Sequence, residues 1–450
     1  MRGGWSKLWR NPAILMLHIS FLVIIAGALL TWLTQQKGYL RLTAGEEVTE
    51  FRVTGGRLLP LPETMELDSF RVEYYPGNTI PKDYKSYLHV GERPCVVSMN
   101  NVLEIHGYRF CQADYDYDGS SVLAVNHDPW GEKVVYAGFA LFALAGLWVL
   151  LSPRCRWRTI MRSLALMAIL FLPESISAAG MPSDGNGQQS ALELVYGRIS
   201  FPALISILLF AGALLSFLAL SGNYRLRRGS SFALWSAWIL SALCLAMQWI
   251  LSGHIPLSNT YETLLFAVWI LELLIALGCR RDMMLQGIAM TFAAALALVA
   301  FLVEEKSGNT HLMPVLNSPW LSIHVSLVMT SYALLGLTFV AAATALLSPS
   351  RAPRMQRISL AALYPAQWLL GLGIITGSIW ANISWGRYWS WDPKETLALV
   401  TFLVYALPLH GNLAIIRTPR RFHIYMLLAI LSVAMTYFGV NLLPSLHSYN

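Results

Sequence analysis

The sequence predicts a polytopic α-helical membrane protein of about eleven transmembrane helices with one small β-rich extracytoplasmic domain. Of its 450 residues, 56% are hydrophobic and only 13% are charged, whereas soluble proteins contain about 25% charged residues. Runs of about 20 largely apolar residues, the length that crosses a bilayer, recur along the chain. A soluble enzyme, a disordered chain and a fibrous protein are excluded, because too few charges remain to cover a water-exposed surface.

The segments that connect the predicted spans alternate between many and few basic residues. About eleven apolar runs are found at 13–33, 134–151, 163–180, 199–220, 232–251, 260–278, 284–303, 324–347, 362–381, 396–416 and 424–441. One set of connecting segments holds 18 of the 32 basic residues, at 2–10, 154–162, 225–228, 280–281, 351–357 and 417–421. The short segments on the other side hold only Arg198, Lys306, Arg387 and Lys394.

The positive-inside rule converts this alternation into an orientation. It places the N-terminus in the cytoplasm and the C-terminus outside, which fits a multi-pass protein of a bacterial cytoplasmic membrane. The net charge of +7 is therefore explained by the basic residues that set the orientation in the membrane, and no nucleic-acid partner is expected.

The run at 163–180 has two interpretations. After a short apolar stretch, Pro173 and Glu174 interrupt it, and SISAAGMP follows at 175–182. This pattern resembles the apolar core and small-residue cleavage site of a signal peptide. A short third span within a linker at 152–197 is favoured because the charge alternation requires one crossing there, but internal cleavage stays open.

Residues 34–133 are expected to form the extracytoplasmic β-domain. Six short segments rich in Val, Tyr, Phe and Leu are separated by turn-forming residues, and they lie at 39–43, 70–75, 87–90, 95–100, 102–110 and 121–125. Cys95 and Cys111 lie near segment ends, and the sequence leaves open whether they form a disulfide. His89, His106 and His127 are expected to be ordinary surface residues of the domain.

The densest chemical cluster is WGRYWSWDPKET at 385–396, between the ninth and tenth predicted spans. An interfacial aromatic belt is the simpler interpretation, but a belt needs neither Gly386 nor an Asp-Pro-Lys-Glu turn before the next helix. A flat aromatic platform edged by charged groups suits a large planar ligand with acidic groups, such as a porphyrin.

Two pairs of histidines fit an iron porphyrin. His324 lies at the outer start of the eighth predicted span and His447 lies beyond the outer end of the eleventh, on the same side as the tryptophan cluster. His18 and His410 are each about six residues from the inner end of a span, roughly 9 Å deep. Histidine is a common axial ligand of haem iron, and ionisable residues inside a membrane are costly and usually functional.

These residues carry a resemblance to a known family. The segment 385–396 is similar to the tryptophan-rich WWD signature of haem-handling proteins. Together with GHIPLSNTYETLLF at 253–266, SPWLSIHV at 318–325 and YFGVNLLPSLHSY at 437–449, it resembles CcsA, also called ResC. The segment 97–131 resembles the outer domain of CcsB, also called ResB.

The chain as a whole resembles a CcsB–CcsA fusion, the system II cytochrome c synthetase. The CcsB-like part, 1–151, is shorter than usual for the family and has two predicted spans around the β-domain. The linker 152–197 and a CcsA-like part with eight spans, 198–450, follow it.

The resemblance implies a role for each site residue. His324 and His447 match the external axial ligands of haem iron, and Trp385, Trp389, Trp391 and Asp392 match the WWD platform. His410 and His18 match transmembrane ligands that hold haem in transit. Haem b, ligated by two histidines, would be the substrate, attached to the CxxCH thiols of apocytochrome c on the outer face. The family also implies a separate thioredoxin-like reductant, which agrees with the absence of CxxC from this sequence.

Two other functions compete with the synthetase. A haem exporter would deliver haem without attaching it, although the CcsB-like domain argues against this. A b-type cytochrome subunit for electron transfer is disfavoured, because prolines between His311 and His324, and between His410 and His423, prevent either pair from sharing a continuous helix. The β-domain alone could also be a receptor or scaffold.

Overall fold

The computed structural model describes residues 12–75, 79–151, 196–303, 312–410, 413 and 416–442. Two features of the sequence, His447 and the run at 163–180, lie outside these residues. The chain divides into two compact units. Unit 1 comprises Met1–Arg158, His311–Leu321 and Ile375–Ser390, and unit 2 comprises Thr159–Thr310, Ser322–Ile374 and Trp391–Asn450.

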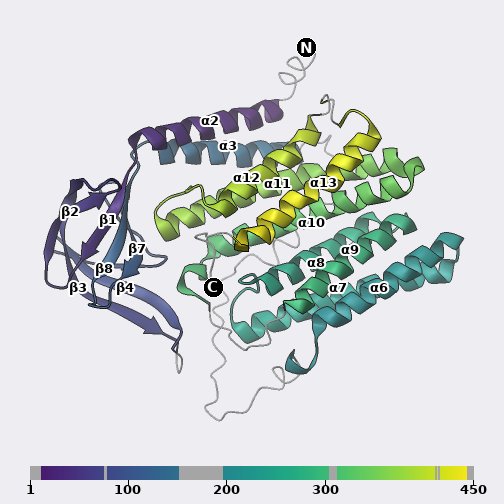
Figure 1. Cartoon of the computed structure of the whole chain (residues 1–450), viewed down its shortest axis with the longest axis horizontal. Helices are drawn as coiled ribbons and strands as arrows, with labels where there is room; N and C mark the ends of the chain where they lie inside the picture. Colours follow the sequence, from purple (N-terminus) through teal and green to yellow (C-terminus); the bar gives the residue numbers. More distant parts are fainter. Residues whose placement is uncertain are drawn as a thin grey trace. The chain divides into compact units, whose positions relative to one another are not determined.

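Unit 1 contains the expected β-domain, an eight-stranded antiparallel sheet in the order β5-β4-β3-β2-β1-β8-β7-β6 (Figure 1). Its strands are β1 (Gln36–Leu42), β2 (Glu47–Val53), β3 (Leu58–Tyr74), β4 (Pro81–Val90), β5 (Arg93–Ser98), β6 (Leu103–Ile105), β7 (Tyr108–Tyr115) and β8 (Ser121–His127). A backbone bridge between Ser98 and Asn101 continues the chain from β5 toward β6.

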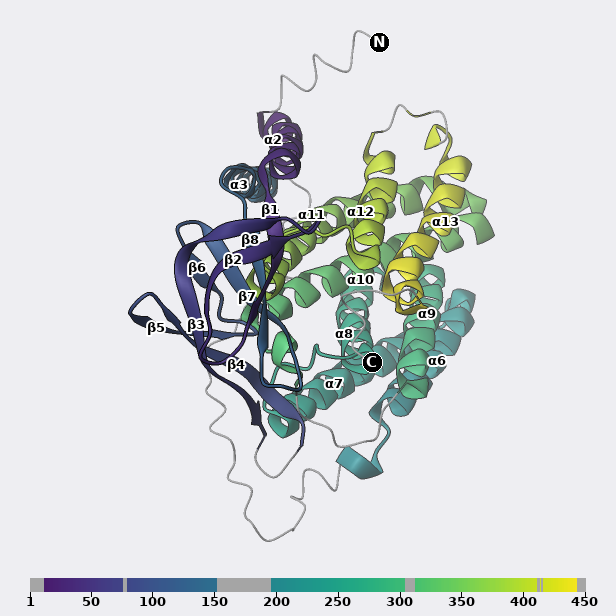
Figure 2. The ribbon, with the colours of Figure 1, turned by 60° about the vertical axis from the view of Figure 1, so that its left-hand side comes forward.

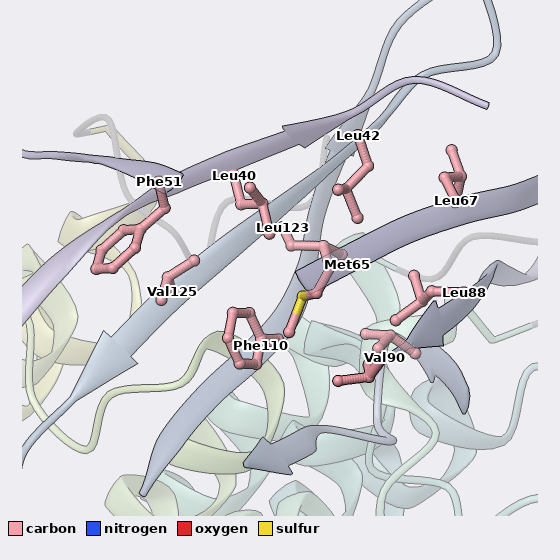
Figure 3. Close-up of a cluster of buried hydrophobic side chains, with 11 residues drawn as sticks. Leu40, Leu42, Phe51, Met65, Leu67, Leu88, Val90, Phe110, Leu123 and Val125 are labelled. Carbon is pink, nitrogen blue, oxygen red and sulfur yellow. The ribbon is translucent and has the colours of Figure 1, made fainter. Parts of the chain in front are cut away.

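The core of the sheet follows the alternation of strand side chains. Successive residues of a strand point to opposite faces, so pairs two apart, such as Leu40 and Leu42, reach the same interior. Figure 3 shows this cluster of buried side chains, which come from β1, β2, β3, β4, β5, β7 and β8. Its labelled members are Leu40, Leu42, Phe51, Met65, Leu67, Leu88, Val90, Phe110, Leu123 and Val125.

The six predicted segments correspond to strands, but the sheet holds more. The segment 102–110 is a hairpin of two strands, because His106 and Gly107 both adopt positive φ, +49° and +82°. A two-residue turn of this kind matches the twist of the flanking strands. Strand β2 and the first half of β3 were not predicted, since charged residues and two prolines obscure their alternation.

Two helices complete the CcsB-like part of unit 1. Helix α2 (Pro12–Thr34) and helix α3 (Gly131–Leu151) lie side by side, as Figures 1 and 2 both show. They pack tightly at Gly131, where an added Cβ would overlap Oγ1 of Thr31. Only glycine permits this contact, which brings Thr31 to the start of α3.

The remaining helices belong wholly or mainly to unit 2. They are α6 (Phe201–Leu218), α7 (Tyr224–Ser252), α8 (Thr260–Gly278), α9 (Met283–Leu302), α10 (Pro319–Leu347), α11 (Ala352–Trp385), α12 (Pro393–Ala406) and α13 (Pro419–Tyr437). The first residues of α10 and the last of α11 fall in unit 1. In the described part of the chain, eight helices are long and apolar enough to cross a membrane: α2, α3 and α6 to α11. The prediction of a polytopic membrane protein is thereby confirmed.

Two other predicted spans differ from expectation. Helix α12 has 14 residues, about 21 Å of helix, and ends before Pro408, which continues the chain as a 3₁₀ turn over Leu407–Leu409. Pro408 has no backbone N–H to donate to the carbonyl four residues earlier, so the α-helical hydrogen bonding does not continue through it and the helix does not reach 416. Helix α13 has 19 residues and begins with Pro419, Arg420 and Arg421. It therefore starts before the predicted span at 424–441 and includes basic residues that the prediction placed in the connecting segment.

Candidate functional site

The tryptophan-rich segment, residues 385–396, is divided between the two units. Residues 385–390 belong to unit 1 and the residues from Trp391 onward belong to unit 2. The first half therefore belongs to the same compact unit as the CcsB-like β-domain, although more than 250 residues of sequence separate them.

Packing against a buried neighbour anchors Trp385, the first tryptophan of the segment. Its ring meets that of Trp380 edge to face, with ring centroids 4.8 Å apart. Trp380 is only 1% exposed, and its indole N–H donates to the carbonyl of Val315 at 3.3 Å. An edge-to-face pair is a favourable aromatic geometry, so this pair fixes the ring at the end of α11.

Gly386 packs tightly against the β-domain. Its φ is +70°, and a Cβ there would lie 2.8 Å from Sγ of Cys111 on β7. The Nδ2 of Asn126 on β8 donates a short hydrogen bond to the Gly386 carbonyl. Glycine is thus required both by the backbone conformation and by the lack of space.

Tyr388 is joined to the CcsB-like part by a chain of hydroxyl groups. Its Oη lies 2.7 Å from Oγ1 of Thr31 on α2, and Thr31 donates to Oδ2 of Asp128 at 2.6 Å. Because the single proton of Thr31 goes to the carboxylate, the Tyr388 hydroxyl must be the donor to Thr31. Burial raises the pKa of Tyr388, so its phenol keeps the proton that it donates. The other oxygen of Asp128 accepts a hydrogen bond at 2.8 Å from the N–H of Gly131, the first residue of α3.

A second group of contacts lies one turn earlier on α11. The side-chain amide of Asn382 donates to Glu132 Oε1 at 2.9 Å and to Tyr136 Oη at 2.7 Å. Glu132 also pairs with Arg109 of β7 at 2.9 Å. Ser384 adds a hydrogen bond to Asn100 at 3.2 Å.

Trp391 and Asp392 open the second half of the segment. Trp391 has a φ of +59° and the residue is 71% exposed. Positive φ is rare for a bulky residue and marks a constrained position. Asp392 caps α12, since its side chain accepts from Lys394 N at 3.1 Å while Glu395 Oε2 accepts from Asp392 N at 3.2 Å. The Asp-Pro-Lys-Glu turn therefore caps the helix that follows it.

The three described candidate histidines share one hydrogen-bonding pattern. Nδ1 of His324 lies 2.7 Å from the Gly373 carbonyl on α11, Nδ1 of His18 lies 2.8 Å from that of Ile14, and Nδ1 of His410 lies 2.9 Å from that of Ala406. A carbonyl only accepts, so each Nδ1 donates, and the neutral form of each ring has its lone pair on Nε2. This is the tautomer that presents Nε2 to a metal.

The surroundings of these histidines differ. His18 and His324 are partly buried within α2 and α10, whereas His410 is exposed and follows the 3₁₀ turn after α12. By contrast, His423 is buried and uses Nε2 toward the Ala352 carbonyl, an arrangement suited to packing.

The structure distributes the sequence-predicted site residues between the units. Trp385, Trp389 and His18 lie in unit 1, and His324, His410, Trp391 and Asp392 lie in unit 2. Among the described residues no three His, Cys, Asp or Glu side chains are grouped to hold a bare metal ion.

Several contact residues of the segment were not predicted from the sequence. They are Thr31, Asn126, Asp128 and Cys111. The signal in the sequence was NHDPW at 126–130, which contains two of these residues and lies between the last strand of the β-domain and α3.

The open question of the disulfide is answered by free thiols at Cys95 and Cys111. Burial raises the pKa of the Cys111 thiol to about 12. The β-domain histidines contact neighbours of their own domain: His89 pairs with Asp68, His106 with Glu63, and His127 stacks on Tyr108.

Comparisons with known proteins divide the chain in the same order. Residues 2–122 match the ResB-like family, and residues 257–447 match the family described as cytochrome C assembly protein. The cytochrome c biogenesis protein CcsA of Prochlorococcus marinus is 33% identical over 257 residues, which cover 48% of this chain and 81% of that protein.

Two further likenesses are more partial. Protein NrfI of Wolinella succinogenes is 34% identical over 309 residues, 63% of this chain, but the match spans only 34% of NrfI. The solved structure of cytochrome c haem lyase CcmF, 19% identical with a TM-score of 0.46, matches 56% of this chain and 47% of that one, and is too distant to carry an argument.

Proposed function

This chain belongs to the CcsA family of cytochrome c biogenesis proteins, here joined to a ResB-like part, and we propose that within cytochrome c assembly it attaches haem covalently to apocytochrome c. The observation that carries the proposal is the tryptophan-rich segment at 385–396, in a family devoted to cytochrome c assembly. The attachment would take place on the outer face of a bacterial cytoplasmic membrane.

The proposed haem site combines aromatic surface, axial ligands and charge. Trp385, Trp389 and Trp391 would lie against the porphyrin, and His324 and His447 would ligate its iron. The Nδ1 contact of His324 with Gly373 supports this role, because it directs the lone pair to Nε2 and restrains the ring. Arg387 and Lys394, the basic residues of the segment, would pair with the acidic propionate groups of haem.

The proposed entry route uses the second pair of histidines. His18 and His410 would ligate haem on its way from the cytoplasmic side, and their Nδ1 contacts likewise leave the lone pair on Nε2. The excess of basic residues in the segments assigned to the cytoplasm supports the orientation.

The reaction itself requires no oxidant. Each cysteine S–H of the CxxCH sequence adds across one vinyl C=C of haem: a bond forms between sulfur and one vinyl carbon, and hydrogen passes to the other carbon. Two additions give two thioether bonds with no net gain or loss of electrons. The protein contributes position, because holding thiols and vinyl groups together converts an encounter into an effectively intramolecular reaction.

The thiols must arrive reduced for this addition. The described residues include no disulfide, and the sequence has no CxxC, so the reductant is assigned to a separate thioredoxin-like partner. Apocytochrome c is the second partner, and membrane lipid surrounds the apolar helices.

Expression in a bacterial host that lacks every other cytochrome c maturation system tests the proposal. We expect c-type cytochrome whose haem stays with the polypeptide after acid–acetone extraction. Haem bound to this chain without attachment to the cytochrome would instead identify a haem-delivery protein. His324→Ala should reduce both bound haem and cytochrome yield, whereas His89→Ala, on the exposed surface of the β-domain, serves as the matched control.

A further inference from the structure

We propose that the ResB-like part positions the aromatic platform, with Thr31 and Asn126 as positioning residues for the first half of the tryptophan-rich segment. This inference rests on the proposed function, because a platform matters only if the segment binds haem. It adds residues from outside the family's tryptophan signature and gives the β-domain a defined task. All of the contacts that support it lie within unit 1.

The first support is the direction of the hydrogen bonds. Tyr388 donates to Thr31, and Thr31 donates to Asp128, at 2.7 and 2.6 Å. Asp128 is in turn held by the backbone at the start of α3. The chain of donors ends on a carboxylate, and hydrogen bonds to charged groups are stronger than neutral ones. The phenol of Tyr388 therefore has one favoured position.

The second support is a contact that tolerates no displacement. Asn126 donates to the carbonyl of Gly386, and Cys111 lies where a side chain at 386 would be. Asn126 and Cys111 are both buried, and they belong to neighbouring strands β8 and β7. The rigid sheet thus holds Gly386 from one side while α2 and α3 hold Tyr388.

These two fixed points are adjacent in sequence to the tryptophans. Trp385 precedes Gly386, and Trp389 follows Tyr388. Consecutive Cα atoms lie 3.8 Å apart across a trans peptide, and this protein has no cis peptide bonds among its described residues. Fixing Gly386 and Tyr388 therefore restricts the backbone that carries both indole rings. A displacement of about 1 Å can reduce a reaction rate by about a hundredfold when positioning supplies the catalysis.

Hydrogen–deuterium exchange on the purified full chain without haem tests the positioning directly. Tyr388→Phe and Thr31→Val each remove one hydroxyl and little else. Each should speed exchange of peptides covering 382–390 about fivefold, the factor expected for one net hydrogen bond. The double variant should exchange no faster than Thr31→Val alone, because that change already breaks the contact with Tyr388. Thr31→Ser keeps the hydroxyl and should behave as wild type.

Matched controls separate positioning from loss of structure. Tyr39→Phe removes a hydroxyl from an exposed tyrosine of β1 and should leave segment 382–390 unchanged. Peptides of β1, β7 and β8 should keep their wild-type exchange in every variant. Faster exchange across the whole sheet, or unchanged exchange at 382–390, would overturn the proposal.

A haem measurement links position to function. In Tyr388→Phe and Thr31→Val the absorption bands of bound haem should weaken or shift, and cytochrome yield should fall. Added imidazole should not restore either, because the proposed axial histidines are intact. Rescue of both by imidazole would show that the variants damage ligation and would contradict the positioning role. Failure of the wild-type chain to attach haem would refute the proposed function and leave the exchange result standing.

Discussion

Replacing Gly386 with alanine should loosen the tryptophan-rich segment from the β-domain through two separable effects. The left-handed backbone, φ +70°, costs an L-residue roughly 1–2 kcal/mol. A Cβ 2.8 Å from Cys111 Sγ adds an overpacking cost of about 1–3 kcal/mol. The variant should therefore destabilise the local structure by about 2–5 kcal/mol.

Gly119→Ala isolates the backbone part of this cost. Gly119 lies in the same β-domain with a φ of +82°, and no heavy atom lies within 4 Å of the place that an added Cβ would occupy. It should therefore cost only about 1–2 kcal/mol. Cys111→Ala combined with Gly386→Ala removes the sulfur that obstructs the new methyl group, so the double variant should recover about 1–3 kcal/mol relative to the sum of the singles.

Native-state hydrogen exchange of the β7 and β8 amides provides the free energy of local opening for five proteins: wild type, Gly386→Ala, Gly119→Ala, Cys111→Ala and the double variant. Cytochrome yield measured in parallel should fall most for Gly386→Ala and least for Gly119→Ala. The reasoning is refuted if Gly386→Ala costs no more than Gly119→Ala, or if the effects of the changes at 386 and 111 simply add.

Three further predictions concern single residues. Asp392→Ala should destabilise the start of α12 by about 0.5–2 kcal/mol, whereas Asp392→Asn keeps an N-cap acceptor; exchange of the α12 amides measures this, and equal losses would exclude a capping role. Because burial raises the pKa of Cys111 from 9.0 to about 12, the unfolded chain loses this proton first as pH rises. The free energy of unfolding should therefore be unaffected below pH 9 and fall by about 1.4 kcal/mol per pH unit between pH 9 and 12. Alkaline unfolding of wild type and of Cys111→Ala measures this, because only the wild type should show the fall. The same pH dependence in both proteins would refute the prediction. His324→Ala should lose the axial-ligand signature in the haem spectrum and regain part of it with imidazole; an unchanged spectrum would contradict ligation.

The sequence allowed the membrane helices and much of the β-domain to be predicted, because each depends on local patterns. Apolar length predicted the long helices, and alternation predicted strands such as β8. Strand β2 was not predicted, because Glu47, Glu50 and Arg52 weaken its alternation of apolar and polar residues. Helix α12 proved shorter than predicted, since Pro408 outweighs the apolar run that surrounds it.

For the candidate site, the sequence predicts only the chemical composition. Tryptophan and histidine are uncommon enough to signal a ligand when they cluster. The contact of Tyr388 with Thr31, 357 residues apart in the chain, leaves no local signal, because Thr and Asp occur near many helix ends. Likewise Asn126 and Cys111 are ordinary strand residues until the fold places Gly386 against them.

The most direct test of the central claim is the mass of a CxxCH cytochrome produced with this chain as the sole maturation factor. The proposed function predicts a polypeptide heavier by one haem, retained under denaturing conditions. It also predicts loss of that mass in the His324→Ala variant. Apocytochrome of unmodified mass, recovered beside wild-type chain that is folded and carries haem, would contradict the claim.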